Sequence, residues 1–438
     1  MKKLGILLIA LAAITIWLQP AKAQGDSPLA LVLTAEGPIT PPMYEYFRRG
    51  INAAERRGAQ VLVIELNTPG GSLDTTVDII QDMRASTVPI VVFVTPNGGM
   101  AGSAGAIITM AAHASAMSPE TAIGAASPIS SSGEDLTETL EAKAKEIMRA
   151  QVRPLVEPRG PKAVALAQAM IEEAKAASAQ EALDVNLIDF IAVDTHDLLS
   201  QLDGFTVTLG GREQKLATAN AVTEPFSMSF IETFLLMLTD PNIAFLLLAI
   251  GVQAILIEIS SPGGWVAGFI GVVCLTLAIY GAGVLPVNWF GIIFILTAFV
   301  LFILDIKAPT HGALTAAGVA SFIVGALVLF NSPGTPSFQR VSVPLVVSVG
   351  VFLGLIFFII IGFALRAQRA PIRIGVESLP GRIGSARTDV GETGQIQVGA
   401  ELWTAERAPD SPAIRRGDRV VVVAIEGLRL KVRKLTQK

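Results

Sequence analysis

A serine set among glycines is the first residue whose surroundings suggest chemistry. Ser103 lies within Thr95–Ala106, where a β-branched run ends and a segment of small residues, expected to be helical, begins. The flanking glycines permit a sharp strand-to-helix turn, which is the backbone geometry that exposes a nucleophilic serine. The helix N-terminus also supplies amide groups for a developing negative charge. A serine that only caps a tightly packed helix is the alternative, and the motif alone leaves both interpretations open.

A second glycine pair follows another predicted strand. Gly70 and Gly71 come soon after Val61–Leu66, at a position that would lie at the same sheet edge as Ser103. There the N–H of Gly71, paired with that of Ala104, would form an oxyanion hole for acyl transfer. An ordinary strand-to-helix turn is the alternative. The conjunction of the two glycine pairs supports the catalytic hypothesis more than either does alone.

A serine nucleophile needs a general base, and the two histidines of this segment are poorly placed. His113 lies well beyond Ser103 in an Ala-rich segment expected to continue as helix, and His196 is expected near the end of the domain and exposed. Lysine remains. It can act as a base only where burial in a low-dielectric environment depresses the pKa of the amine toward neutrality.

The predicted helix Leu136–Val156 offers two lysines. At about 100° per residue, Lys143 falls at the margin of an apolar stripe, whereas Lys145 points to the opposite side. The stripe consists of Leu136, Leu140, Ala144 and Ile147. Lys143 is therefore the lysine most able to be buried. The alternative is that its stem lies on the stripe while its ammonium stays in water, and spacing does not decide between the two.

These residues need a water-soluble domain to position them, and we expect one over residues 24–203. Short β-branched runs alternate with amphipathic stretches, a pattern typical of parallel strands joined by crossover helices. The predicted strands are Leu29–Thr34, Val61–Leu66, Ile90–Thr95 and Phe190–Val193, and the predicted helices are Pro42–Arg57, Leu73–Ser86, Leu136–Val156 and Pro161–Ala177. Residues 204–226 are expected to be a linker.

Long apolar runs predict a transmembrane region over residues 227–368. The short run Phe230–Leu238 cannot cross a bilayer and is expected to lie in the interface or to re-enter. Basic residues after the third and the last span, Lys307 and Arg366, predict that these ends face the cytoplasm. Five runs have roughly the length of a bilayer core: Ile243–Ile259, Trp265–Gly283, Trp289–Ile306, Gly312–Phe330 and Val343–Leu365.

Both ends of the chain have recognisable patterns. Residues 1–23 combine two lysines, an apolar run and a small-residue cleavage site, which indicates a signal peptide and export of the domain that follows; an uncleaved anchor helix is the alternative.

Residues 371–438 contain short strands punctuated by glycines, which predicts a small OB-like barrel on the cytoplasmic side. This barrel is interpreted as a protein-contact or regulatory module.

Composition excludes several classes of function. With 51% hydrophobic and only 16% charged residues, the chain is too apolar for an ordinary soluble domain. A net charge of −4 argues against a nucleic-acid partner. The single cysteine, Cys274, lies in an apolar run and offers neither a disulfide nor a cysteine zinc site. We expect no cofactor and no metal.

The motifs together resemble the membrane-bound ClpP-class serine proteases of the long-form NfeD family, over nearly the whole chain. The resemblance implies a multidomain protein with a ClpP/crotonase-like α/β domain, a helical bundle of about five spans and a C-terminal OB-fold domain. It implies Ser103 as nucleophile, Lys143 as base, and the amides of Gly71 and Ala104 as oxyanion hole. Lys145 is kept as the alternative base. The motifs are Thr68-Pro69-Gly70-Gly71, Gly102-Ser103-Ala104-Gly105, Arg153-Pro154-Leu155-Val156-Glu157, Glu181-Ala182-Leu183 and Ile188-Asp189.

Two departures from the family pattern concern the site. Gly102 stands where alanine is common, and Glu146 stands where an asparagine usually follows the lysine. The resemblance also implies a substrate class, the hydrophobic segments of stomatin-like membrane proteins, and we expect at least a homodimer in the cell membrane. One alternative is a non-catalytic scaffold for a stomatin- or flotillin-like partner. A crotonase-type acyl-CoA enzyme is disfavoured by export and by the missing carboxylate base.

Three polar residues in the predicted spans raise the question of a transport path. Gln253, Glu258 and Asp305 lie within or at the ends of apolar runs. Ionisable groups inside a membrane often mark ion or substrate pathways. Because Glu258 and Asp305 lie at predicted helix ends, interfacial placement is the favoured interpretation.

Overall fold

The computed structural model describes residues 28–128, 137–260, 263–307, 310, 312–332, 335–368 and 378–436. The predicted signal peptide, residues 1–23, lies outside the described residues, as does Leu136 of the predicted lysine helix. The chain forms two compact units, an N-terminal domain with most of the helical bundle and a unit that contains the C-terminal barrel.

A six-stranded parallel sheet forms the centre of the N-terminal domain. Alternate residues of its strands face two separate cores, so that Leu31 and Leu33 pack into one and Ala30 into the other. This arrangement explains the alternation of β-branched runs and helices in the sequence. In sheet order the strands are β11 (Val222–Phe226), β1 (Leu29–Glu36), β2 (Val61–Asn67), β3 (Ile90–Val94), β5 (Ala114–Met117) and β8 (Phe190–Ile191).

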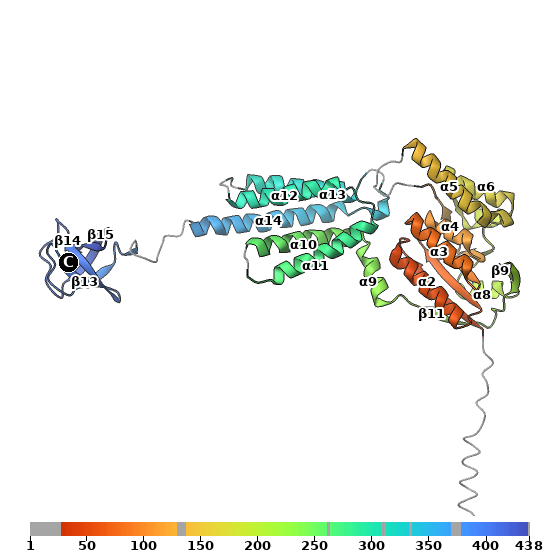
Figure 1. The fold of residues 1–438 in the computed structure, drawn as a ribbon, viewed down its shortest axis with the longest axis horizontal. Coiled ribbons are helices and arrows are strands. Elements are labelled where there is room, and N and C mark those ends of the chain that lie inside the picture. The colour runs from red at the N-terminus through yellow and green to blue at the C-terminus, as the bar shows by residue number, and fades with distance from the viewer. Residues whose placement is uncertain are drawn as a thin grey trace, which may run out of the picture. The chain divides into compact units, whose positions relative to one another are not determined.

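Helices cover both faces of this sheet (Figure 1). Several pack on the larger core, and a single helix with a β-hairpin covers the smaller one. On the larger core lie α2 (Pro41–Arg56), α3 (Leu73–Ala85), α4 (Ala104–Ala111), α5 (Glu138–Val156), α6 (Pro161–Glu172) and α7 (Ala179–Asp184), and the short η1 (Glu157–Arg159) follows α5. On the smaller core lie α8 (Thr195–Leu202), β9 (Thr206–Leu209) and β10 (Arg212–Lys215).

A small sheet beside the central one was not predicted. Its strands are β4 (Met100–Gly102), β6 (Ala122–Gly124) and β7 (Ala176–Ser178). Each is three residues long, which is too short for a periodic pattern to appear in the sequence. Strand β4 leads directly into α4, so this sheet fixes the turn that contains Ser103.

Two local expectations in this domain require correction. Residues 204–226, expected as a linker, contain the hairpin β9–β10 and the edge strand β11, which pairs in parallel with β1. Strand β11 is largely exposed and contains Pro225, which only an edge strand tolerates, so it lacks the alternation of a half-buried strand. The small-residue helix α4 ends at Ala111, and His113 therefore precedes β5 and does not continue a helix.

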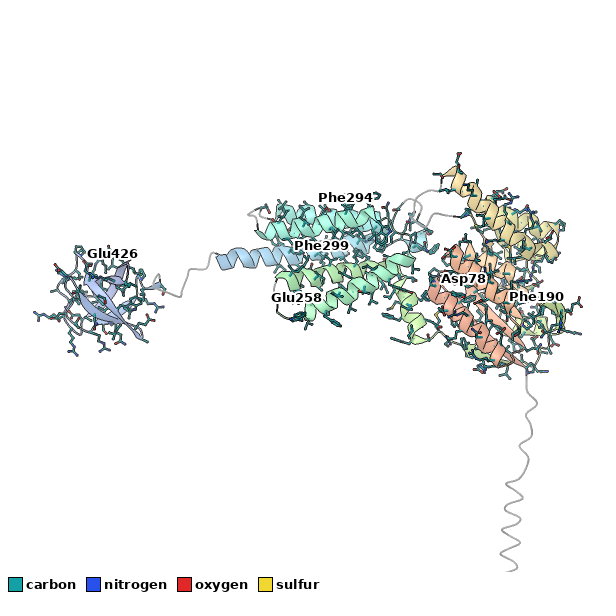
Figure 2. All side chains as sticks on the ribbon, in the orientation of Figure 1. Asp78, Phe190, Glu258, Phe294, Phe299 and Glu426 are labelled. Atoms are coloured by element: carbon teal, nitrogen blue, oxygen red, sulfur yellow. The ribbon has the colours of Figure 1, made fainter. Side chains whose placement is uncertain are left out.

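Apolar helices follow the N-terminal domain (Figure 1). The helices are α9 (Phe230–Leu238), α10 (Pro241–Ser260), α11 (Val266–Val284), α12 (Phe290–Lys307), α13 (Ala313–Phe330) and α14 (Val343–Gln368). Among the described residues, four helices are long and apolar enough to cross a membrane, and the apolar part of α12, Phe290–Asp305, is shorter. Two phenylalanines of α12 differ in exposure: Phe299 is buried within the bundle, whereas Phe294 is 44% exposed (Figure 2).

The C-terminal residues fold into a closed five-stranded barrel. Alternate strand residues such as Ile396, Ala405 and Val420 fill its interior. The barrel strands, in order around the barrel, are β12 (Ile383–Ala386), β13 (Gly394–Val398), β14 (Glu401–Arg407), β16 (Arg429–Lys434) and β15 (Arg419–Glu426). The predicted fold class, an α/β domain followed by apolar helices and a small β-barrel, is confirmed.

Candidate active site

The turn between β4 and α4 holds Ser103 in a strained backbone conformation. Its φ of 46° lies in the left-handed region, which non-glycine residues rarely adopt and which is common at functional sites. The backbone N–H of Ser103 donates to the carbonyl of Gly124 on β6 at 2.7 Å, so the small sheet fixes the turn. Although Ser103 occupies the N-cap position of α4, its hydroxyl makes no capping hydrogen bond. Ser103 is partly exposed, and the missing cap hydrogen bond disfavours the capping alternative.

The glycine pair at the end of β2 lies against this serine. A Cβ added to Gly70 would be 2.8 Å from Cβ of Ser103 and 3.4 Å from its Oγ, so only glycine fits at this distance. Gly70 also has a φ of +124°, which further requires glycine. A Cβ on Gly71 would be 2.1 Å from the carbonyl oxygen of Ile39. The structure thus brings the two predicted glycine motifs together.

The amides of Gly71 and Ala104 are free to donate. Ile39 pairs in parallel with Gly71 by donating its N–H to Gly70 O and accepting from Ser72 N, which leaves the Gly71 N–H directed away from Ile39. Ala104 begins α4, so its N–H has no intrahelical acceptor. Within the described residues neither N–H donates to another backbone group, and such amides beside a hydroxyl can stabilise an oxyanion.

The contact between Gly70 and Ser103 predicts that adding a single methyl group at Gly70 will lower the free energy of unfolding by an unusually large amount. We expect Gly70→Ala to lower the free energy of unfolding by about 3 kcal/mol or more, because strain at positive φ adds to an overlap with Ser103. Gly58→Ala is the matched control: Gly58 also has a positive φ, +60°, but nothing lies within 4 Å of an added Cβ. That variant should lose only about 1 kcal/mol. Thermal unfolding of the purified chain measures both, and equal losses would contradict the close approach.

Lys143 lies on an exposed part of α5. The buried face of this helix is formed by Met148, Val152 and Val156, whereas Leu140 and Ile147 of the predicted apolar stripe are 54% and 56% exposed. Of the two alternatives that the spacing leaves open for Lys143, the single chain has the one in which the side chain stays in water, because the first turns of α5 extend beyond the core. Helix α5 packs against α4. Within the described residues, no hydrogen bond joins Lys143 to Ser103.

The fallback lysine has a different environment. Lys145 pairs with Glu141 at 2.7 Å and donates to the carbonyl of Glu172 at 3.1 Å. The hydrogen bond that Lys145 donates to the Glu141 carboxylate raises the pKa of Lys145, which favours the protonated amine. A base must be uncharged, so the structure disfavours Lys145 in this role.

An ion pair between Arg159 and Asp189 anchors α5, the helix that carries Lys143. The sequence alone did not indicate this pair. Arg159, just after α5, donates to both carboxylate oxygens of Asp189 at 2.9 and 3.0 Å. Asp189 also accepts from the backbone N–H of Ser115 on β5 at 2.8 Å. The C-terminal end of α5 is thus fixed to the central sheet, and among the described residues no such ion pair joins the end that carries Lys143 to this sheet. The motif Ile188-Asp189 was noted in the sequence, but its arginine partner lies too far along the chain to be identified there.

The histidines do not belong to the site. His196 lies exposed on α8, as predicted. His113 accepts a hydrogen bond at Nδ1 from the backbone N–H of Ile90 at 3.1 Å. Burial, with a smaller contribution from Arg84, lowers the pKa of His113 from 6.5 to about 4. A neutral, backbone-bonded His113 has a structural role in joining β3 to the start of β5.

The low pKa of His113 predicts a pH dependence of stability. Between pH 6.5 and about 4 the unfolded chain binds a proton at this residue that the folded chain does not, so stability falls as the pH falls through this window and is constant below it. We expect His113→Asn, which keeps an acceptor near Ile90 N, to remove about 2 kcal/mol of this loss. Unfolding measured at pH 7 and pH 4 checks it, with His196→Asn as control. An unchanged pH dependence in His113→Asn would count against the assignment.

Models of three NfeD domains match consecutive parts of the chain. They are the NfeD1b N-terminal domain over residues 31–204, the NfeD integral membrane domain over 242–362, and the NfeD-like C-terminal, partner-binding domain over 376–434. The sequence is 33% identical to the membrane-bound protease PH1510 of Pyrococcus horikoshii over 92% of this chain and 93% of that protein. It is 23% identical to the membrane protein NfeD1b of Bacillus subtilis over 99% of this chain and 98% of that one.

A solved structure is also similar in sequence. The membrane protease 1510-N of Pyrococcus horikoshii, described as specific for a stomatin homolog, is 28% identical, covers 49% of this chain and 99% of its own, and has a TM-score of 0.42. With the full-length identity to PH1510 and the three matching domains in their order along the sequence, the chain belongs to the NfeD family.

Proposed function

We propose that this protein is a membrane-bound serine endopeptidase in which Ser103 is the nucleophile. The observation that carries the proposal is the strained turn at Ser103, which presents an uncapped hydroxyl at the N-terminus of α4 with the Gly70–Gly71 turn against it. A full-length relative at 33% identity is named a protease, which supports the same chemistry. In this mechanism Lys143 is the general base, and the amides of Gly71 and Ala104 form the oxyanion hole.

The proposed reaction has two steps. An uncharged Lys143 amine takes the proton from Ser103 Oγ as the oxygen attacks a peptide carbonyl, and the two amides stabilise the tetrahedral oxyanion. The protonated lysine then gives its proton to the leaving amine, which leaves an acyl group on Ser103. A water molecule, deprotonated by the same lysine, releases the acyl group and regenerates the hydroxyl.

Lys143 must be desolvated for this chemistry, and the single chain leaves it exposed. Leu140 and Ile147, on neighbouring turns of α5, are also exposed, so apolar surface around Lys143 is available for burial. We propose that a second copy of the chain or the bound substrate covers these turns and makes the amine uncharged. Oligomerisation would then be part of the catalytic cycle.

The substrate class follows from the resemblance to the family. Hydrophobic segments of stomatin-like membrane proteins are the proposed substrates, and a stomatin-like protein is the proposed partner of the C-terminal barrel. The predicted signal peptide and the basic residues after the spans support an extracytoplasmic protease domain and a cytoplasmic barrel in the cell membrane.

A non-catalytic scaffold is the second candidate. The exposure of Lys143 favours it, and so does the similarity to a relative that is named only as a membrane protein, NfeD1b. The experiment that separates the two incubates the purified chain with peptides that span the hydrophobic segment of a stomatin-like protein. The endopeptidase produces two fragments whose masses sum to that of the peptide plus one water. Binding of the peptide without fragments would support the scaffold.

A further inference from the structure

Helix α9 connects the N-terminal domain to the first membrane helix, and one side of it is bound to that domain. Arg49 on α2 donates from Nε and Nη2 to the two carboxylate oxygens of Glu232 on α9, at 2.8 and 2.6 Å. Arg49 also donates to the carbonyl of Ser227 at 2.7 Å. Its guanidinium lies over the ring of Phe226 on β11, 4.3 Å from the centroid. A bidentate, charge-assisted hydrogen bond of this kind fixes the orientation of α9 relative to α2 as well as the distance between them.

Glu232 is positioned by its own helix as well. It accepts from the backbone N–H of Ser229 at 2.6 Å, and the Ser229 hydroxyl in turn accepts from Glu232 N, so that the two residues form a capping box. Glu232 is only 8% exposed. A carboxylate this buried must be paired, and Arg49 is the partner that pairs it. We refer to the Arg49–Glu232 contact as the α2–α9 clasp.

The C-terminal end of α9 is held by the membrane helices. A Cβ added to Gly281 of α11 would be 2.4 Å from the carbonyl oxygen of Leu238, so α11 approaches α9 as closely as glycine allows. Asp240, just before α10, then accepts from Asn242 N at 2.8 Å. Because only Thr239 and Asp240 separate α9 from α10, the connection places α9 at the boundary of the membrane region.

The remaining side of α9 is apolar and partly to largely exposed. Phe230, Phe234 and Met237 lie on one face at helical spacing, and the rings of Phe230 and Phe234 stack at 6.2 Å. Phe230 is 84% exposed and Met237 47%, values like those of residues on the membrane helices such as Phe290, at 68%. A short helix with a buried polar side and an apolar outer face suits the boundary between headgroups and acyl chains.

We propose that α9 lies in the bilayer interface with Phe230, Phe234 and Met237 among the acyl chains, and that the α2–α9 clasp seats the N-terminal domain on it. The occupant of this face is lipid, because a membrane helix, α10, follows α9 after two residues and another, α11, packs against its end. The clasp fixes the distance and orientation of the domain, including the Ser103 turn, relative to the membrane surface. This role does not depend on whether the protein cleaves peptides.

Site-directed nitroxide labels test the lipid contact. Cys274 is the single cysteine of the chain, so Cys274→Ala gives a background for Phe230→Cys or Met237→Cys in vesicles of phosphatidylcholine and phosphatidylglycerol. We expect the α9 labels to collide severalfold more with oxygen than with a water-soluble nickel chelate, relative to the exposed control Ser200→Cys on α8. Labels as accessible to nickel as that control would overturn the proposal. Labels shielded from both reagents would indicate a protein contact and also overturn it.

The clasp is tested by a distance between two labels. With Phe230→Cys and Ser200→Cys labelled together, pulsed electron resonance should give a narrow distance distribution in the full chain. Arg49→Ala should broaden it at least twofold, and Glu232→Gln should broaden it less. Arg48→Ala is the matched control, because the neighbouring Arg48 pairs with Glu45 and lies over the ring of Tyr44, both on its own helix, and its removal should leave the distribution unchanged. Narrow distributions in folded Arg49→Ala and Glu232→Gln would contradict the clasp.

Discussion

Ser103→Ala is expected to abolish peptide cleavage, by about 10⁴-fold or more, while the protein stays folded. Loss of the nucleophile removes the covalent step, and only residual stabilisation by the oxyanion hole remains. The hydroxyl makes no capping hydrogen bond, so its removal should change the free energy of unfolding by less than about 0.5 kcal/mol. Fragment yield by mass spectrometry and the unfolding midpoint together measure both effects.

Ser72→Ala provides the matched control for this serine. Ser72 follows the same glycine turn, but its hydroxyl caps α3 by accepting from Thr75 N. Its removal should lower stability by about 1 kcal/mol and leave cleavage intact. The two serines should therefore show opposite patterns. Cleavage that survives in Ser103→Ala would refute the nucleophile assignment.

The second large effect is expected at Lys143. Lys143→Ala should reduce cleavage by about 10²–10⁴-fold, which is the range for loss of a general base. Lys143→Arg should be equally inactive, because a guanidinium remains protonated and cannot accept the serine proton. The rate of single-turnover acylation is the measurement, because it isolates the step in which the proton is transferred.

Lys145→Ala distinguishes this role from a general effect on α5. Lys145 is two residues away and pairs with Glu141 at the surface of the helix. Its removal should lower stability by less than about 1 kcal/mol and retain cleavage. If Lys145→Ala is the inactive variant and Lys143→Ala is not, the base has been assigned to the wrong lysine.

The sheet and the bend at Ser103 were predictable because their signals are local or periodic. Buried parallel strands such as β2 and β3 appear as continuous β-branched runs, and a Gly-flanked serine between a strand and a helix has few structural solutions. The convergence of Gly70 with Ser103 followed from parallel topology, which brings the carboxyl ends of neighbouring strands to one edge. The structure adds the strain at Ser103 and its anchor at Gly124, neither of which leaves a pattern in the sequence.

Features that depend on contacts distant in sequence were not predictable. The edge strand β11 is exposed and lacks alternation, and the three-residue strand β4 is too short to have any. On α5 the buried face contains Met148 and Val152 and not the predicted stripe, and packing against α4 and α6 selects it. The exposure of Lys143 follows from that selection. The Arg159–Asp189 pair likewise joins residues thirty positions apart.

The central claim is that Ser103 is a nucleophile activated by Lys143, and covalent labelling tests it most directly. The purified chain is treated with an aryl fluorophosphonate, digested and examined by mass spectrometry. We predict a phosphonyl adduct on the peptide that contains Ser103, formed much more slowly in Lys143→Ala and at the wild-type rate in Lys145→Ala. No adduct on that peptide, or an adduct that forms equally fast without Lys143, would contradict the account.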